Sequence, residues 1–197
     1  MNRKELPLNL DELEEYLTEE LGEDIKEFRT EEIEKGLSKK YMKLIWMRVI
    51  KDSFRDAVKA IADIQTPHLS VASGSDKGDF VELIYHFMVN YGFAEQETAI
   101  NLKVHLPKDD LNIPTITDIV PGAITTEREK QEFLGIDVKD IPDDRRMWLD
   151  ENYPEDKYPW RWDEDGMEDM SRHVHEKEQT FEEPVSERVK KEEKDGE

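Results

Sequence analysis

The sequence predicts an α+β protein: a two-layer sandwich with a mixed β-sheet, an acidic helical N-terminal extension and an irregular C-terminal tail. Three observations predict this class. Apolar residues recur at helical spacing near the N-terminus, β-branched or alternating segments dominate residues 41–106, and regular patterning fades after residue 145. The resulting order is helix, strand, helix, three strands and a further helix, which is typical of two-layer α+β folds.

The first 38 residues are predicted to form the acidic helical extension. Residues 9–22 carry leucines at three- and four-residue steps, and Gly22 supplies a stop. A second helical stretch is expected through Ile25, Phe28 and Ile33. These helices either pack on their own domain or dock a leucine stripe on a partner. The leucines concerned are Leu10, Leu13, Leu17 and Leu21.

Residues 39–145 are predicted to form the α+β domain, which begins with a central strand over residues 41–50 because that segment is rich in β-branched and aromatic residues. A helix capped by Asp52 or Ser53 should follow and end at Pro67. The apolar side chains expected on its inner face are Phe54, Ala57, Val58, Ile61 and Ile64.

Three strands are expected next. A short one begins at Leu69, and residues 73–79 read as a turn because they contain two glycines and two aspartates. The apolar run of residues 80–93 follows and bends near residues 90–92. Residues 98–106 then alternate between apolar and polar, which predicts a strand with one buried face.

The last predicted helix of the domain follows a proline-containing connector, residues 107–117. Pro121 fits the first helical turn, and Gly135 fits the left-handed position just past a helix end. Within the helix, Arg128 stands four residues from Glu132, so the guanidinium can reach that carboxylate one turn away.

Residues 146–170 form an irregular segment with five large aromatic side chains, which are unfavourable in water. We expect this segment to dock on a partner, although covering the domain's own core is the alternative. Residues 171–197 are nearly all polar and are predicted to be disordered in isolation. The five aromatic residues are Trp148, Tyr153, Tyr158, Trp160 and Trp162.

Composition narrows the classes of function. The chain has a formal net charge of −21, which disfavours binding to nucleic acid or directly to an anionic membrane. It contains no cysteine and therefore no thiolate ligand for an iron–sulfur cluster. Its 39% charged residues are typical of hyperthermophilic proteins, and disordered tails would also raise this share. Among the histidines, His173 and His175 have a metal-ligand spacing, but a solvated pair in the tail is the favoured interpretation.

Three motifs occur in order along the second half of the chain. Residues 127–136 read Glu-Arg-Glu-Lys-Gln-Glu-Phe-Leu-Gly-Ile, residues 142–146 read Pro-Asp-Asp-Arg-Arg, and residues 158–163 read Tyr-Pro-Trp-Arg-Trp-Asp. Together they resemble the signature of the hydrophilic thirty-kilodalton subunit of respiratory NADH–quinone oxidoreductase (complex I). The resemblance covers residues 40–165. In the last motif, tryptophans replace the family's usual small apolar residue and its lysine.

The composition and the last motif favour the branch of archaeal membrane-bound hydrogenase and sulfane-sulfur reductase subunits. The resemblance implies a non-catalytic, cofactor-free structural and assembly subunit of the peripheral arm. Its partners would be a large catalytic subunit related to nickel–iron hydrogenase and a small iron–sulfur subunit. Those subunits would hold it, indirectly, at the cytoplasmic side of the cell membrane.

The resemblance also marks motif residues that would fasten a loop to the helix or reach across to the catalytic subunit, since arginines can hold carboxylates bidentately. The alternative to the whole hypothesis is a free-standing acidic binding or regulatory module whose motif match is accidental. The predicted motif and interface residues are Glu127, Arg128, Glu129, Glu132, Gly135, Asp143, Arg145, Arg146, Trp160, Arg161 and Asp163.

Overall fold

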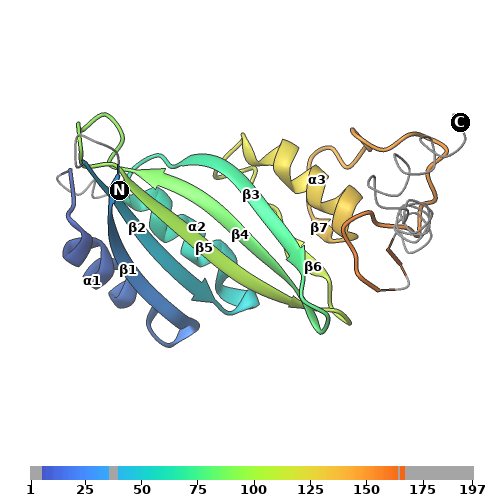
Figure 1. Ribbon diagram of the computed structural model, residues 1–197, viewed down its shortest axis with the longest axis horizontal. Helices are drawn as coiled ribbons and strands as arrows, with labels where there is room; N and C mark the ends of the chain where they lie inside the picture. Colours follow the sequence, from blue (N-terminus) through green and yellow to red (C-terminus); the bar gives the residue numbers. More distant parts are fainter. Residues whose placement is uncertain (1–5, 36–39, 164, 167–197) are drawn as a thin grey trace, which may run out of the picture.

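A five-stranded mixed β-sheet is the centre of the computed structural model, which describes residues 6–35, 40–163 and 165–166 (Figure 1). The strand order is β1-β2-β5-β4-β3. The β2–β5 pair is parallel and the other three pairs are antiparallel, which confirms the predicted class. The strands are β1 (Ile25–Lys35), β2 (Lys40–Val49), β3 (His68–Asp76), β4 (Phe80–Val89) and β5 (Thr98–Pro107).

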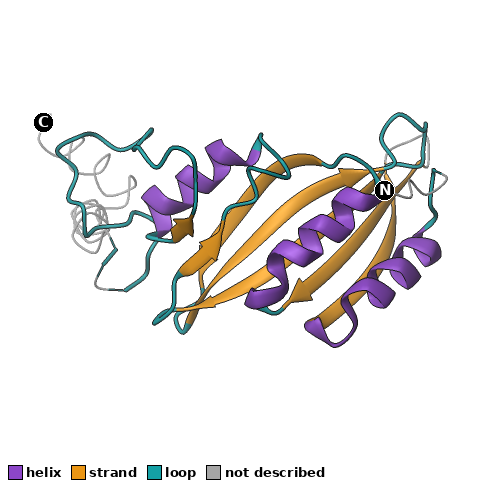
Figure 2. Ribbon diagram, turned by 180° about the vertical axis from the view of Figure 1, so that it is seen from behind, coloured by secondary structure: helices purple, strands orange, loops and turns teal. Residues whose placement is uncertain are grey.

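Helices α1 (Leu10–Leu21) and α2 (Phe54–Ile64) cover one face of this sheet (Figure 2). The Tyr16 hydroxyl donates to the Ala60 carbonyl oxygen at 3.2 Å and ties the two helices together. The alternation predicted for β5 is confirmed, since its apolar side chains are buried against the helices. α2 also forms as predicted, although Ser53 makes no capping bond and instead donates to the Asp24 carboxylate.

The prediction of a second helical stretch near the N-terminus is wrong, because Ile25, Phe28 and Ile33 lie in strand β1. β1 pairs with β2 in antiparallel register, so that Phe28 faces Met47 and Thr30 faces Ile45. Its apolar positions match a helical step by coincidence. Backbone pairing with β2 decides the conformation, since it satisfies the amide groups of this charged segment.

The structure also corrects the predictions for two shorter segments. The turn expected over residues 73–79 begins later, because β3 continues to Asp76. The connector of residues 107–117 contains strand β6 (Asn112–Pro114), which pairs in parallel with β7 (Asp137–Lys139) in a small second sheet. Both strands have only three residues and too little pattern to be recognised in the sequence.

Helix α3 (Ala123–Leu134) flanks the edge strand β3 and joins the large sheet to the C-terminal part of the chain (Figure 1). The Thr126 hydroxyl accepts from the Ala72 amide at 2.9 Å and donates to the Ala72 carbonyl oxygen at 3.1 Å. These bonds cap one position of the open edge. Pro121 precedes the helix rather than forming its first turn, whereas Gly135 adopts the predicted left-handed conformation, with φ of 69°. The predicted tail and its two histidines lie outside the described residues.

Candidate functional site

Glu127 is fully buried and holds α3 to the loop that follows β6. Its carboxylate accepts from the Thr115 hydroxyl at 2.6 Å and from the Ile116 amide at 2.9 Å. Burial raises the pKa of Glu127 above its ordinary value, and the two hydrogen bonds offset part of this effect. This motif residue is therefore an internal support of the domain.

Arg128 and Glu132 do not form the predicted one-turn pair but bind the part of the chain that we call the C-terminal segment, residues 143–163 and 165–166. Arg128 Nε donates to the Arg145 carbonyl oxygen at 2.8 Å, and Nη1 lies 3.3 Å from Asp143 Oδ2. The Glu132 carboxylate accepts three successive backbone amides of the segment, two of them at 2.9 and 3.0 Å. Those amides belong to Met147, Trp148 and Leu149.

The paired arginines stiffen the first part of the C-terminal segment. Arg145 holds Asp143 bidentately, with Nε–Oδ1 and Nη2–Oδ2 distances of 2.8 and 2.7 Å. Hydrogen bonds from Arg145, together with the charge of Arg128, hold the pKa of Asp143 well below its usual range. Arg146 donates to the Tyr153 carbonyl oxygen at 2.8 Å. Within the chain, these arginines fasten the loop that follows β7 to itself and to α3.

Aromatic contacts fix the last part of the C-terminal segment on α3. Trp160 stacks on Phe133 with 4.6 Å between ring centroids, and its amide donates to the Phe133 carbonyl oxygen at 2.9 Å. Lys130 Nζ lies 4.8 Å from the centre of the Trp160 ring. The ring of Tyr158 lies so close to Gly135 that a Cβ there would come within 2.6 Å of it. Gly135 is therefore required both for its positive φ and for this close approach.

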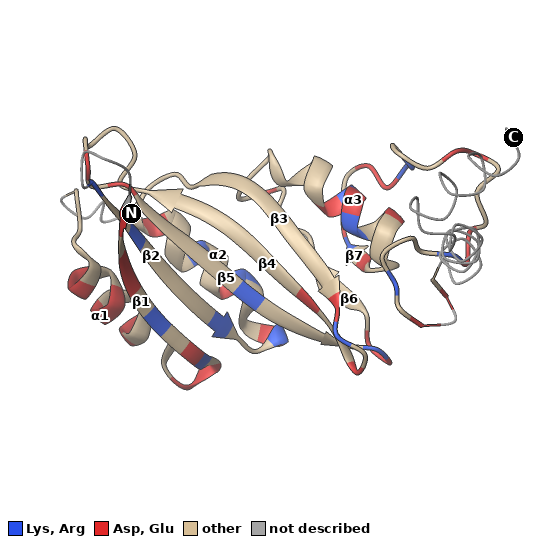
Figure 3. Cartoon of the chain, viewed as in Figure 1, with Lys and Arg blue, Asp and Glu red and all other residues tan. Residues whose placement is uncertain are grey.

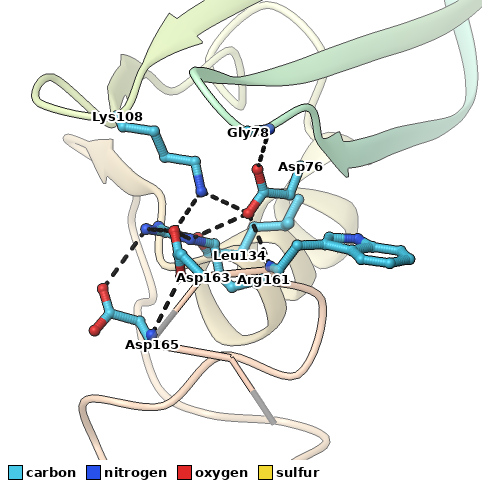
Figure 4. Close-up of polar contacts among 8 residues, drawn as sticks. Asp76, Gly78, Lys108, Leu134, Arg161, Asp163 and Asp165 are labelled. Carbon is cyan, nitrogen blue, oxygen red and sulfur yellow. Dashed lines mark hydrogen bonds and ion pairs between the residues drawn. The ribbon is translucent and has the colours of Figure 1, made fainter. Parts of the chain in front are cut away.

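Five charged residues form a second group, which we call the Asp76 cluster. Figure 4 shows Lys108, Arg161 and Asp163 gathered around Asp76. Lys108 Nζ lies 2.5 Å from both Asp76 Oδ2 and Asp163 Oδ2. Arg161 Nη2 lies 2.6 Å from Asp163 Oδ2 and 3.6 Å from Asp165 Oδ2, and Arg161 Nε lies 3.6 Å from Asp76 Oδ2. The cluster joins the end of β3, the loop after β5 and the C-terminal segment.

Two carboxylates of the Asp76 cluster, those of Asp76 and Asp163, have lowered pKa values. The Asp76 side chain is fully buried, and burial alone raises its pKa, but hydrogen bonds from Lys108 and from the amides of Trp162 and Gly78 lower it below the ordinary value. The pKa of Asp163 falls to about 2, because bonds from Arg161 and Lys108 outweigh its desolvation. These charges stabilise one another as a network.

The predicted site residues all lie on α3, at its end or in the C-terminal segment, and the structure brings these two parts together. Glu129 pairs with Lys130 and borders a cavity of about 280 Å³ that Val71 and Trp148 also line. Sequence reasoning missed Asp76 and Lys108. The only local signal at Asp76 is its turn with Gly78, whose amide donates to Asp76 Oδ1 at 2.9 Å.

This arrangement fastens chain segments to one another, since its charged groups are engaged mainly with the chain's own backbone and side chains. No group of three metal-ligating side chains occurs among the described residues. Within that same part of the chain, no helix is long and apolar enough to cross a bilayer. The fold and the site define an α+β domain in which one helix, α3, holds a C-terminal segment of the same chain.

The chain belongs to the family described as the 30 Kd subunit of respiratory-chain NADH dehydrogenase, whose pattern matches residues 47–169. The family predicted from the motifs is therefore confirmed. Membrane-bound hydrogenase subunit beta of Pyrococcus furiosus is 32% identical over 124 residues, which are 62% of this chain and 71% of that protein. NAD(P)H-quinone oxidoreductase subunit J of Prochlorococcus marinus is 32% identical over 103 residues, or 50% of this chain and 58% of that protein.

A solved structure has the same fold. It is that of the membrane-bound sulfane sulfur reductase, an archaeal respiratory membrane complex. One of its chains matches with a TM-score of 0.64 and 21% identity, covering 88% of this chain and 94% of that chain. At this level of identity, the likeness supports the fold.

Proposed function

We propose that this chain is a structural and assembly subunit in the peripheral arm of a membrane-bound oxidoreductase related to complex I, of the hydrogenase or sulfane sulfur reductase type. It carries no cofactor and braces a large catalytic subunit related to nickel–iron hydrogenase. The observation that carries the proposal is the 32% identity to a membrane-bound hydrogenase subunit over 71% of that protein's length.

The surface around α3 supports a partner-binding role. The C-terminal segment leaves large apolar side chains accessible, at exposed fractions of 37–86%. Tryptophan and methionine are enriched in protein interfaces, and a free-standing protein gains nothing from exposing them together. Because the charged motif residues are used to hold the segment, the partner would meet mainly the apolar side chains that the segment presents. These are Met147, Trp148, Trp160 and Trp162.

In this proposal the subunit lies at the cytoplasmic side of the membrane and beside a small iron–sulfur subunit. Other subunits hold it there, since its net charge of −21 opposes direct contact with anionic lipid. Electrons bypass it, because a chain without cysteine supplies no thiolate ligand for a cluster.

Purification of a tagged full-length chain from detergent-solubilised native membranes tests the proposal. We expect mass spectrometry to find a large subunit related to nickel–iron hydrogenase in the same particle. Two paired-cysteine motifs in that subunit would indicate a hydrogenase, and their partial or complete loss a sulfur or quinone reductase. Recovery of the chain alone would refute the proposal and favour a free-standing acidic module.

A further inference from the structure

Trp162 is the most exposed large apolar side chain in the described part of the protein, with 86% of its surface accessible. The side chains of its two sequence neighbours are much less exposed. The Arg161 side chain is 7% exposed and that of Asp163 is 33% exposed, and both belong to the Asp76 cluster. An indole thus projects into solvent from a stretch whose flanking side chains are engaged.

Three contacts fix the chain at Trp162, one through its own amide and two through the side chains of its neighbours Arg161 and Asp163. Its amide donates to Asp76 Oδ2 at 2.9 Å, and Asp76 is fully buried at the end of β3. Arg161 Nη1 donates to the Leu134 carbonyl oxygen at the end of α3, at 3.2 Å. Asp163 is bound by Lys108 from the loop after β5, at 2.5 Å. Figure 4 shows these groups converging from separate parts of the fold.

This rigidity matters for binding. A side chain presented on a fixed backbone loses less conformational entropy on association than one on a flexible loop. Tryptophan is enriched among the few residues that dominate interface energies, and it can bury about 200 Å² of surface. Within the domain itself, an indole exposed to this degree contributes little packing.

We propose that Trp162 is the anchor with which this subunit enters an apolar pocket on a neighbouring protein subunit. The inference rests on the proposed function and adds the contact by which it operates. Asp163 and Asp165 lie beside the anchor, and their side chains are 33% and 50% exposed. The partner pocket therefore carries basic side chains at its rim, which complement these carboxylates.

A protein pocket fits the surroundings of Trp162 better than a lipid surface does. Tryptophan also inserts at membrane interfaces, but basic residues usually accompany it there. Here the adjoining Asp163 and Asp165 are acidic, and Figure 3 shows Asp and Glu positions, coloured red, on most of the labelled helices and strands. An anionic bilayer repels such a surface.

The test compares tagged full-length variants expressed in cells that retain the untagged chain, so that the two compete for the complex. The readout is the amount of hydrogenase-related large subunit recovered per tagged chain from solubilised membranes. We expect Trp162→Ala to recover at least tenfold less than the unchanged tagged chain, or about 1.4 kcal/mol. Trp162→Phe should restore part of the loss. Tyr41→Ala, which removes a 57% exposed side chain from β2, is the matched control and should bind normally.

Each outcome decides a separate point. The isolated Trp162→Ala chain should unfold at the same temperature as the unchanged chain, so that lost recovery reports binding; an equal loss of thermal stability would assign Trp162 to the fold instead. Normal recovery with Trp162→Ala overturns the anchor and leaves the proposed function standing. Failure of the unchanged chain to recover the large subunit overturns both. Trp162-dependent binding to protein-free phosphatidylglycerol–phosphatidylcholine vesicles would overturn the protein pocket in favour of lipid.

Discussion

Replacing Asp76 with asparagine should free the end of the C-terminal segment while the sheet stays folded. Asp76 is the buried acceptor to which Lys108, Arg161 and the Trp162 amide converge. Asparagine has nearly the same shape but carries no charge and one acceptor oxygen in place of two. The substitution therefore removes the electrostatic centre of the cluster with little change in volume.

The expected loss follows from the contacts. Breaking a fully buried ion pair costs about 3–5 kcal/mol. The loss should be smaller than this here, because the Lys108 side chain is 20% exposed. In addition, Lys108 and Arg161 both keep Asp163 as a partner. The amides of Trp162 and Gly78 donate to different oxygens of Asp76, so one of them loses its acceptor in the variant, and the loss of this hydrogen bond adds about 1 kcal/mol. We expect a decrease of about 2–3 kcal/mol in the free energy of unfolding.

Two assays read this effect. Guanidinium unfolding of the full chain gives the change in stability, and limited trypsin digestion detects release of the segment through faster cleavage at Lys157 and Arg161. The matched control is Asp118→Asn, which removes an ion pair between Asp118 and Arg55 with an N–O distance of 2.7 Å and side chains 58% and 30% exposed. Such a pair is worth at most about 1 kcal/mol. Equal losses in the two variants, or unchanged cleavage in Asp76→Asn, would refute the reasoning.

Three further predictions concern pH, burial and backbone geometry. Because the pKa of Asp163 is depressed to about 2, its stabilisation is present above the ordinary value of about 4 and should be lost as pH falls through 2, which the tryptophan fluorescence of the segment can follow. Burial raises the pKa of Glu127, so the folded state favours the protonated carboxyl group. The effect of Glu127 on stability therefore has the opposite pH dependence, and its stabilising contribution is lost as pH rises. Glu127→Gln should therefore be at least as stable as the unchanged chain in thermal melts at pH 7, and a large loss would contradict this assignment. Gly135→Ala should destabilise more than Gly78→Ala in the same melts, because both have positive φ, costing about 1–2 kcal/mol, but only the former meets the ring of Tyr158.

Local pattern predicted most of the secondary structure, and its failure at β1 is instructive. The alternation in β5 indicates a strand because one face packs on helices, which is a local consequence of burial. β1 is an edge strand that pairs with β2 alone in the large sheet, so its sequence retains charges and only a few apolar residues. Its identity as a strand comes from β2, to which it bonds, and no periodicity within residues 25–35 reveals that partner.

For the motifs too, local sequence predicted some features and tertiary packing determined the others. Residue type and short spacing were enough to establish the family, the left-handed position of Gly135 and the concentration of aromatic residues after residue 145. Packing in three dimensions determined that Glu132 and Arg128 bind the C-terminal segment, and that Asp76 holds Trp162 from 86 positions away. Contacts at such separations arise when independently formed elements pack together, and local sequence carries no record of which surfaces will meet.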